Sequence, residues 1–187
     1  MFVFSFSTYG IAAFELACAL RKPEDSISIY HIAAVPSAYS EDENSISPQT
    51  IAQDMHRRAR HLPPSKFMMT IRRKTSYDQK THIVISQVAN TCQAKLLFLG
   101  YYGRKNQEEE EESKDQIGAN VLHCLKNIKC TSFIIKNNHH LPSHRPALRF
   151  ICGFDGSRGA LVALQRVLEI IHESDSLLVV RPSSPLP

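Results

Sequence analysis

Short apolar runs alternate with stretches of helical spacing along most of the chain, and this alternation limits the fold more than any other feature. The apolar runs are rich in Ile, Val, Leu and Phe, and Gly or Pro residues separate them from the helical stretches. The predicted strands cover 2–7, 26–35, 66–71, 95–100 and 131–136. The predicted helices cover 12–21, 49–60, 77–93 and 118–126.

Strands that alternate with helices in this way predict a doubly wound α/β fold of the Rossmann-like type. We expect a five-stranded parallel sheet in the strand order 3-2-1-4-5, with helices on both faces. Right-handed crossovers then place the carboxyl ends of all strands at one edge, where ligands bind in this class. A turn is expected at Tyr9-Gly10, between the first strand and the first helix.

The pattern of strand, helix and strand begins again after a polar linker. The second set covers 150–157, 160–172 and 177–180, and the chain then ends in a Pro-rich segment. This organisation predicts a complete domain over 1–137, a linker over 138–147, and a partial second copy over 148–187.

The two sets align as an internal repeat. The aligned pairs are Phe150 with Phe2, Leu168 with Leu20 and, after two additional residues in the second copy, Asp175 with Asp25. A copy deep in the chain cannot be a targeting segment, so the repeat argues against interpreting the apolar N-terminus as a signal peptide. We expect a cytoplasmic protein.

The composition is that of an ordinary globular protein, with 43% hydrophobic and 21% charged residues. The net charge of +4 is mild and does not by itself indicate a nucleic-acid partner. No apolar run reaches the length of a membrane span. The five cysteines form no C-x-x-C pair, and we expect them to be reduced thiols in the core.

Two clusters of charge have a functional and a plain interpretation. Basic residues gather at Arg57–Arg60 and Arg72–Lys74, which makes an RNA contact one alternative. No aromatic residues interleave with them, so a solvated helix face is favoured. The consecutive glutamates Glu108–Glu112 are typical of a solvated loop.

Three histidines, His139, His140 and His144, lie in the linker near Cys130. A zinc site is the functional alternative here, but the spacing matches no established ligand pattern. An exposed linker is the favoured interpretation, and we expect no metal site.

Several stretches together resemble the universal stress protein family. Gly118 opens a helix, Cys130 stands at the step before the last strand, and that strand is apolar, as at the end of the family's domain. Residues 150–168 resemble the family's opening strand, its Asp-Gly-Ser turn and its first helix. His31 matches a histidine that often ends the second strand. Thr131, however, replaces the proline that usually follows the cysteine.

The resemblance covers 2–136 as one whole domain and about 148–182 as the first part of another. It implies the fold of adenine nucleotide α-hydrolase-like proteins. It also implies a homo-oligomer, or a pseudo-dimer formed by tandem copies, because family members pair through the last strand.

ATP-binding members of the family use a loop of the form Gly-x2-Gly-x9-Gly-Ser/Thr. Its glycines let backbone N–H groups approach phosphates, and the helix that follows adds a partial positive charge. This sequence keeps Gly100, Gly103 and Gly118, but fourteen residues rather than nine separate the last two. Ala119 stands where the hydroxyl residue belongs, and the glutamate run lies inside the insertion.

Two further positions belong to the expected site. Ser7 stands where the family has an Asp at the end of the first strand. Ile32 is a candidate to frame an adenine ring by apolar contact, and core packing is its alternative role.

The resemblance therefore implies a stress-response regulatory or interaction protein with a degenerate nucleotide pocket and no catalysis. No nucleophile, base and acid set is evident, and Gly-x-Ser-x-Gly is absent. The alternative is a sensor that binds ATP or AMP through Gly100, Gly103 and Gly118, with slow ATP hydrolysis. We expect neither a nucleic acid nor a membrane as partner.

Overall fold

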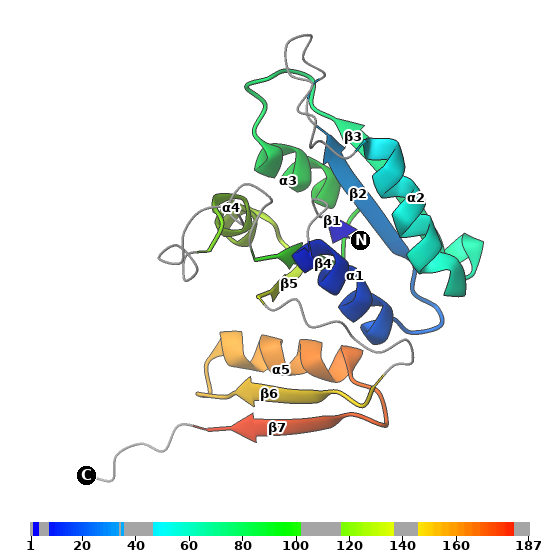
Figure 1. Ribbon diagram of the computed structural model, residues 1–187. Helices are drawn as coiled ribbons and strands as arrows, with labels where there is room; N and C mark the ends of the chain where they lie inside the picture. The colour runs from blue at the N-terminus through cyan, green and yellow to red at the C-terminus, as the bar shows by residue number, and fades with distance from the viewer. Residues whose placement is uncertain are drawn as a thin grey trace.

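The computed structural model describes residues 2–3, 8–33, 35, 47–101, 117–136 and 146–181 (Figure 1). Five parallel strands lie in the order β3-β2-β1-β4-β5. They are β1 (Phe2–Val3), β2 (Ile27–Ala33), β3 (Phe67–Arg73), β4 (Leu96–Gly100) and β5 (Thr131–Ile135). The helices between them are α1 (Thr8–Leu20), α2 (Pro48–Arg58), α3 (Thr81–Thr91) and α4 (Ala119–Asn127), with short 3₁₀ turns at Ala59–His61 and Pro64–Lys66.

The expected α/β class with parallel strands is confirmed. Most of the paired residues lie in the outer strand pairs, β2 with β3 and β4 with β5. The β2–β3 pairing extends from Ile27 opposite Phe67 to Ala33 opposite Arg73. At the centre, Phe2 of β1 pairs with Ile29 on one side and with Phe98 on the other. Only the first two residues of the strand expected over 2–7 belong to β1, and the rest lie outside the described residues.

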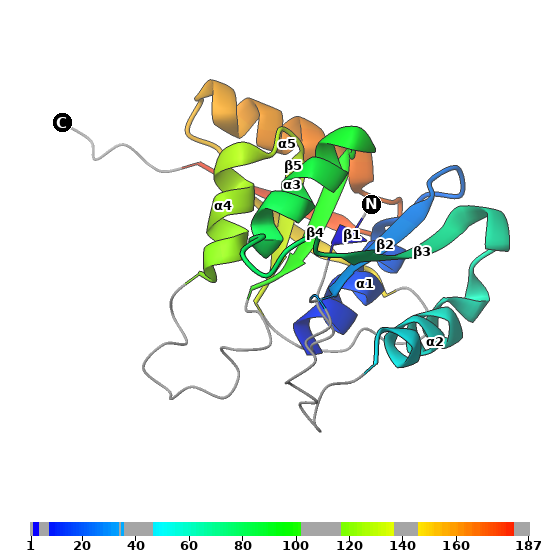
Figure 2. The same ribbon diagram turned by 90° about the horizontal axis from the view of Figure 1, so that it is seen from above.

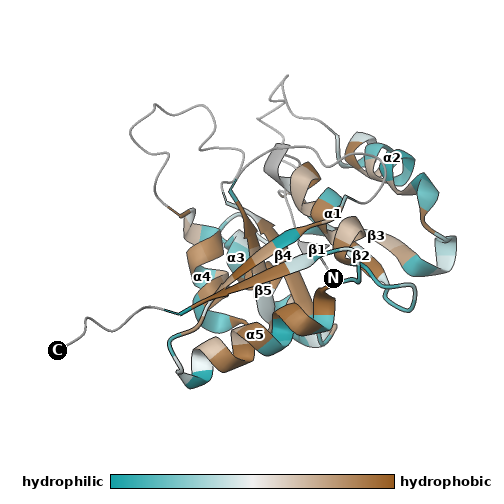
Figure 3. Ribbon diagram, turned by 90° about the horizontal axis from the view of Figure 1, so that it is seen from below, coloured by the Kyte–Doolittle hydropathy of each residue, from teal (hydrophilic) through white to brown (hydrophobic). Residues whose placement is uncertain are grey.

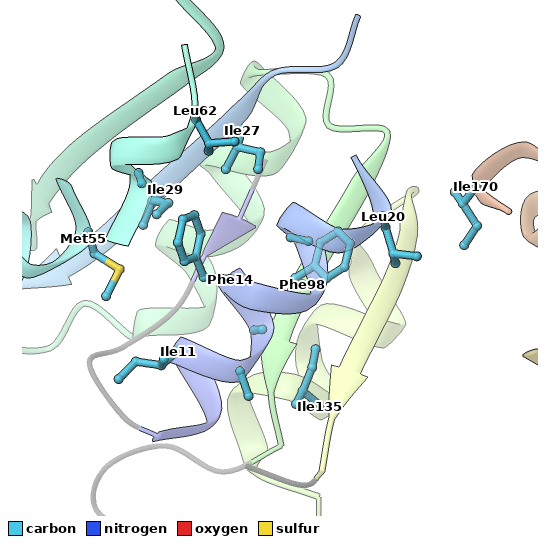
Figure 4. Packing of buried hydrophobic residues seen from close by; sticks show 14 residues of the cluster. Ile11, Phe14, Leu20, Ile27, Ile29, Met55, Leu62, Phe98, Ile135 and Ile170 are labelled. Atoms are coloured by element: carbon cyan, nitrogen blue, oxygen red, sulfur yellow. The ribbon is translucent and has the colours of Figure 1, made fainter. Parts of the chain in front are cut away.

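Helices cover both faces of the sheet, with α1 and α2 on one face and α3 and α4 on the other (Figures 1 and 2). Side chains alternate between the two faces along a strand. Ile27 and Ile29 accordingly join the cluster under α1 and α2, which is drawn in Figure 4, whereas Tyr30 joins the cluster under α3 and α4. Burial of these two apolar faces is the main force that holds the layers together.

One local prediction is wrong. Tyr9-Gly10, predicted as a turn, lies in the first turn of α1, and Gly10 is buried. A glycine weakens a helix most in its interior, so a position in the first turn tolerates it. Burial of α1 against the sheet outweighs the local preference.

A second unit of strand, helix and strand follows in the order β6 (Arg149–Gly153), α5 (Arg158–Ile170) and β7 (Ser176–Val180). Its two strands form a separate parallel sheet. Figure 1 shows this unit below α1 and β5. The arrangement repeats that of β1, α1 and β2.

The second unit has the same element order as β1, α1 and β2, but the constant spacing between them differs from the expected alignment of Leu168 with Leu20 and of Phe150 with Phe2. The helices begin at Thr8 and Arg158 and end at Leu20 and Ile170, so one constant spacing relates both ends. Leu20 therefore corresponds to Ile170 and not to Leu168. The same spacing relates the following turns, and it carries the strand pair Phe2–Ile29 onto Cys152–Val179. No inserted residues are needed.

The turn after each helix is built in the same way. Asp25 accepts a hydrogen bond from the Lys22 backbone N–H at 3.0 Å, and Asp175 accepts one from the His172 N–H at 2.9 Å. The other carboxylate oxygen of Asp175 accepts from the backbone N–H of Leu148 at 2.8 Å. This bond ties the end of the linker to the turn.

Few apolar side chains join the second unit to the first. Ile170 is buried in the first core cluster, where Figure 4 shows it reaching from α5 toward Leu20, and Leu148 and Phe150 pack against the same cluster. The rest of the unit leaves several large apolar side chains exposed, and Figure 3 colours much of α5 as hydrophobic. The large exposed residues are Ile151, Leu161, Val162, Leu168, Leu178, Val179 and Val180.

The cysteines are free thiols, as expected, but they are not all in the core. Cys124 and Cys152 are buried, and Cys18 and Cys130 are half-buried. Cys92 is exposed, which corrects the prediction for that residue. It lies at the end of α3, where its sulfur is 3.1 Å from the hydroxyl oxygen of Tyr30.

Candidate functional site

The carboxyl ends of the parallel strands meet at one edge of the sheet, as the expected topology requires. At this edge β4 ends at Gly100 and β5 ends at Ile135. Gly118 directly precedes α4. Its backbone N–H is bonded to Tyr101, the residue after β4, so the N-terminus of α4 lies beside these strand ends. The structure therefore brings Gly100, Gly118 and Ala119 to one edge.

Tyr101 connects these parts. Its backbone N–H donates to the carbonyl oxygen of Ile135 at 2.9 Å, and its own carbonyl oxygen accepts from the Gly118 N–H at 3.3 Å. The Tyr101 side chain is buried, and the Lys136 ammonium lies 5.4 Å from the centre of its ring. The segment between Tyr101 and Gly118 is thus closed at its two ends by a backbone hydrogen bond.

This bond changes the expected role of Gly118. A phosphate cradle needs backbone N–H groups directed at the ligand, but the Gly118 N–H is directed at Tyr101. The φ of Gly118 is −56° and its ψ is 139°, which any residue adopts. Neither the donor nor the backbone conformation at Gly118 is specific to a phosphate-binding loop.

Among the residues that the structure describes, no side chain caps the N-terminus of α4. By contrast, Ser47 caps α2 through a bond from the Thr50 N–H at 3.1 Å, and Ser157 caps α5 through a bond from the Ala160 N–H at 3.1 Å. Ala119, which stands where the resemblance implies a hydroxyl, is exposed. The first-turn amides of α4 are therefore the groups at this edge that suit an anion.

The remaining predicted site residues are placed as follows. Ile32 is half-buried and packs against the cluster under α3 and α4, which is the core role named as its alternative. Ser7, Gly103 and the glutamate run Glu108–Glu112 lie outside the described residues, as do His139, His140 and His144.

A polar contact that the sequence did not reveal lies beside the α4 N-terminus. The rings of His82 on α3 and His123 on α4 stack with centroids 3.9 Å apart and an angle of 27° between their planes. His82 Nδ1 is 3.3 Å from Asn120 Oδ1, also on α4. The two histidines are far apart in sequence, so only the packing of α3 on α4 brings them together.

In the Asp-Gly-Ser turn of the second unit, the side chain of Asp155 accepts a hydrogen bond from within the turn. The Ser157 N–H donates to Asp155 Oδ1 at 2.8 Å, and hydrogen bonds from Ser157 lower the pKa of the Asp155 carboxyl. Gly156 has a φ of 84°, a left-handed conformation that favours glycine. These residues shape the start of α5.

Thiol chemistry is not favoured at Cys18 and Cys124. Burial raises the pKa of Cys18 to about 12 and that of Cys124 to about 11, so both stay protonated at neutral pH. Within the described ranges, no group of three or more His, Cys, Asp or Glu side chains is arranged to hold a metal ion. Among the helices of the described part, none has the length and apolar character that crossing a membrane requires.

Comparison with known proteins supports the fold. No family model matches the sequence, and no curated protein matches it. The structure is similar to that of the hypothetical protein MJ0577, the subject of a structure-based assignment of biochemical function, with a TM-score of 0.53 at 14% identity. The match covers 72% of this chain and 94% of that chain. The hypothetical protein PH0823 is matched at a TM-score of 0.43 and 17% identity, over 72% of this chain and 93% of that one.

Proposed function

We propose that the chain is a universal-stress-protein-type regulatory or interaction protein that binds ATP weakly or not at all and catalyses no reaction. It comprises a complete domain over 1–137 on one five-stranded sheet, a linker over 138–147, and a partial second copy over 148–187. The fold shared with MJ0577 and the sequence resemblance support the family. Free thiols among the described cysteines support a reducing, cytoplasmic location.

The observation that carries the proposal is the bond from the Gly118 N–H to the Tyr101 carbonyl. A triphosphate at this edge would have to replace that bond or bind without the Gly118 donor. Losing a donor to a charged oxygen weakens binding by about 1.5–3 kcal/mol, which is one to two orders of magnitude in affinity.

Ala119 removes a second donor. A serine or threonine there would offer a hydroxyl to a phosphate, as Ser47 and Ser157 offer theirs to their own helices. The methyl group of Ala119 offers none. With both donors lost, the helix dipole of α4 is an attraction that the described residues still offer, and it contributes about 0.3–1 kcal/mol at an exposed site.

Calorimetric titration of the purified chain with Mg²⁺ and ATP, and separately with AMP, tests the proposal. We expect no saturable heat at micromolar nucleotide. Ala119→Ser should strengthen any residual ATP binding by about tenfold, because it restores a hydrogen bond to a charged group. Ala163→Ser, on the exposed side of α5, is the matched control and should change nothing. Micromolar binding by the unaltered chain overturns the proposal.

The second candidate function is a sensor of ATP or AMP with slow hydrolysis. The uncapped N-terminus of α4 at the carboxyl edge favours it, because unsatisfied amides there attract phosphate. In this case replacing Gly103 and Gly118 with valine should abolish binding, since Cβ branches would fill the space that a phosphate needs. Binding that survives both replacements removes this candidate.

We further propose that the chain assembles with a second copy or a pseudo-dimer partner. The motivating observation is the apolar surface of the second unit, where Leu161 is 53% exposed and Leu178 is 58% exposed. Light scattering coupled to size-exclusion chromatography should give more than one chain per particle. A monomer at tens of micromolar chain contradicts this proposal without affecting the nucleotide proposal.

A further inference from the structure

The stacked histidines and Asn120 form a polar part of the contact between α3 and α4. Below them the helices share a core, to which Val84 and Ile85 contribute from α3 and Val121 and Cys124 from α4. His82 is the second residue of α3, and His123 lies one turn into α4. Figure 2 shows the two helices side by side.

The hydrogen bond to Asn120 defines how the pair takes up protons. With Asn120 Oδ1 as the acceptor, His82 Nδ1 carries a hydrogen. His82 Nε2 is then the atom that accepts a further proton. The neutral rings stack without electrostatic penalty, whereas two imidazolium rings at a centroid distance of 3.9 Å repel each other.

The surroundings favour the neutral pair. Lys80, the residue before α3, places a positive charge near His123, and Lys126 follows one turn later on α4. Neither helix contains an Asp or Glu. Burial, the charge of His82 and that of Lys80 all lower the pKa of His123.

We propose that the His82–His123 pair is a proton-operated contact, which holds the first half of α4 against α3 when neutral and releases it in mild acid. An ordinary histidine takes up its proton near pH 6.5. Burial and the nearby Lys80 charge oppose protonation of His123 while the helices are in contact. Separation of the helices removes this opposition, so acid favours separation. The inference goes beyond the proposed function and does not depend on nucleotide binding.

Release has a consequence at the sheet edge. Gly118, whose N–H closes the segment after β4, is the residue that precedes α4. Loosening the first turns of α4 therefore also loosens the bond to Tyr101. At neutral pH the Gly118 N–H is bonded to the Tyr101 carbonyl oxygen. In acid we expect this bond to break more often, which frees the Gly118 N–H.

Backbone hydrogen exchange, corrected for intrinsic rates, tests the contact in the full chain. Between about pH 7.5 and 5.5 we expect the protection of the α4 amides of His123 and Cys124 to fall at least about tenfold relative to the amides of β4, which has no titratable side chain. His123→Phe keeps a stacked ring without a proton site, and it should abolish this loss. His61→Phe, on an exposed 3₁₀ turn, is the matched control and should keep the loss.

A second variant, at the other ring, keeps the test valid if His123→Phe fails to fold. His82→Phe removes the other proton site and should likewise leave α4 protection independent of pH. Nuclear magnetic resonance titration of the remaining His123 ring in that variant should show a raised midpoint. Constant α4 protection in the unaltered chain, or a pH-dependent loss that persists in both Phe variants, overturns the inference.

Discussion

At the scale of single residues, the backbone of Gly118 shows why a glycine in a motif does not define its chemistry. The sequence places Gly118 where a phosphate donor is expected. The structure directs its N–H to Tyr101 instead and gives it an ordinary negative φ. Spacing along the chain limits where a glycine lies in the fold, but it does not specify which acceptor its N–H finds.

His31 is the residue for which we expect the clearest dependence of stability on pH. It lies on β2 opposite Ile71, and within the described residues its buried Nδ1 has no hydrogen-bond partner. Burial lowers its pKa, so the folded chain resists a proton that the unfolded chain binds near pH 6.5. The unfolded state then binds more protons between these two pKa values, and stability falls as the pH falls through that window.

Urea unfolding at several pH values measures this effect. The free energy of unfolding should decline from about pH 7 to 5, and His31→Leu should make the decline shallower. Ile71→Val, which carries no proton site, should lower stability by about 0.5–1.5 kcal/mol at every pH and leave the slope unchanged. Equal slopes for His31→Leu and the unaltered chain would show that His31 is not buried as a neutral ring.

At the scale of elements, strong apolar periodicity predicts strands well, whereas matching identical residues misaligns the two copies. Strands such as β4 and β5 were predicted to within a residue because an apolar run between helical stretches leaves little choice. The repeat was aligned by matching Leu168 to Leu20, yet the helix ends match Ile170 to Leu20. Leucine recurs along any apolar helix face, so a shift of two residues still produces matches.

The paired turns after α1 and α5 provide an internal comparison. Asp175 is half-buried and accepts from both Leu148 and His172, whereas Asp25 is exposed and accepts from Lys22. We expect Asp175→Ala to lower the stability of the second unit by about 2 kcal/mol and Asp25→Ala to cost about 1 kcal/mol in the first. Hydrogen exchange of the strand amides reports each unit separately.

Asp175→Asn supplies the control for this comparison, because it keeps an acceptor oxygen but loses the charge. The loss of stability caused by Asp175→Asn should be smaller than that caused by Asp175→Ala but greater than zero. If Asp175→Ala changes the exchange of β6 and β7 no more than Asp25→Ala does, the second bond to Leu148 does not contribute.

At the scale of the whole molecule, the topology could be reasoned from sequence, but the contacts of the site could not. Alternating strands and helices imply a parallel sheet and a common carboxyl edge, which brings Gly100 and Gly118 together. Contacts between helices, such as His82 with His123, depend on how two helices are rotated against each other. The apolar stripe of a helix indicates which face turns to the sheet, but it does not show which polar residues beside that stripe meet a neighbouring helix.

The attachment of the second unit is the whole-molecule feature that is simplest to test. Ile170 is 7% exposed and Leu168, on the same helix, is 56% exposed. Ile170→Ala should lower the free energy of unfolding by about 2–4 kcal/mol, because it opens a cavity between α5 and the first core. Leu168→Ala should stay within about 0.5 kcal/mol. Similar costs in urea unfolding would contradict the packing of α5 on the main domain.

The central claim is that the edge near Gly118 is closed by its own backbone, and nuclear magnetic resonance of the ¹⁵N-labelled chain titrated with Mg²⁺ and ATP tests it most directly. The account predicts that the amide signals of Gly118, Ala119 and Asn120 show no saturable movement below about millimolar nucleotide. Saturable movement of the Gly118 and Ala119 signals, with a midpoint in the micromolar range, would contradict it.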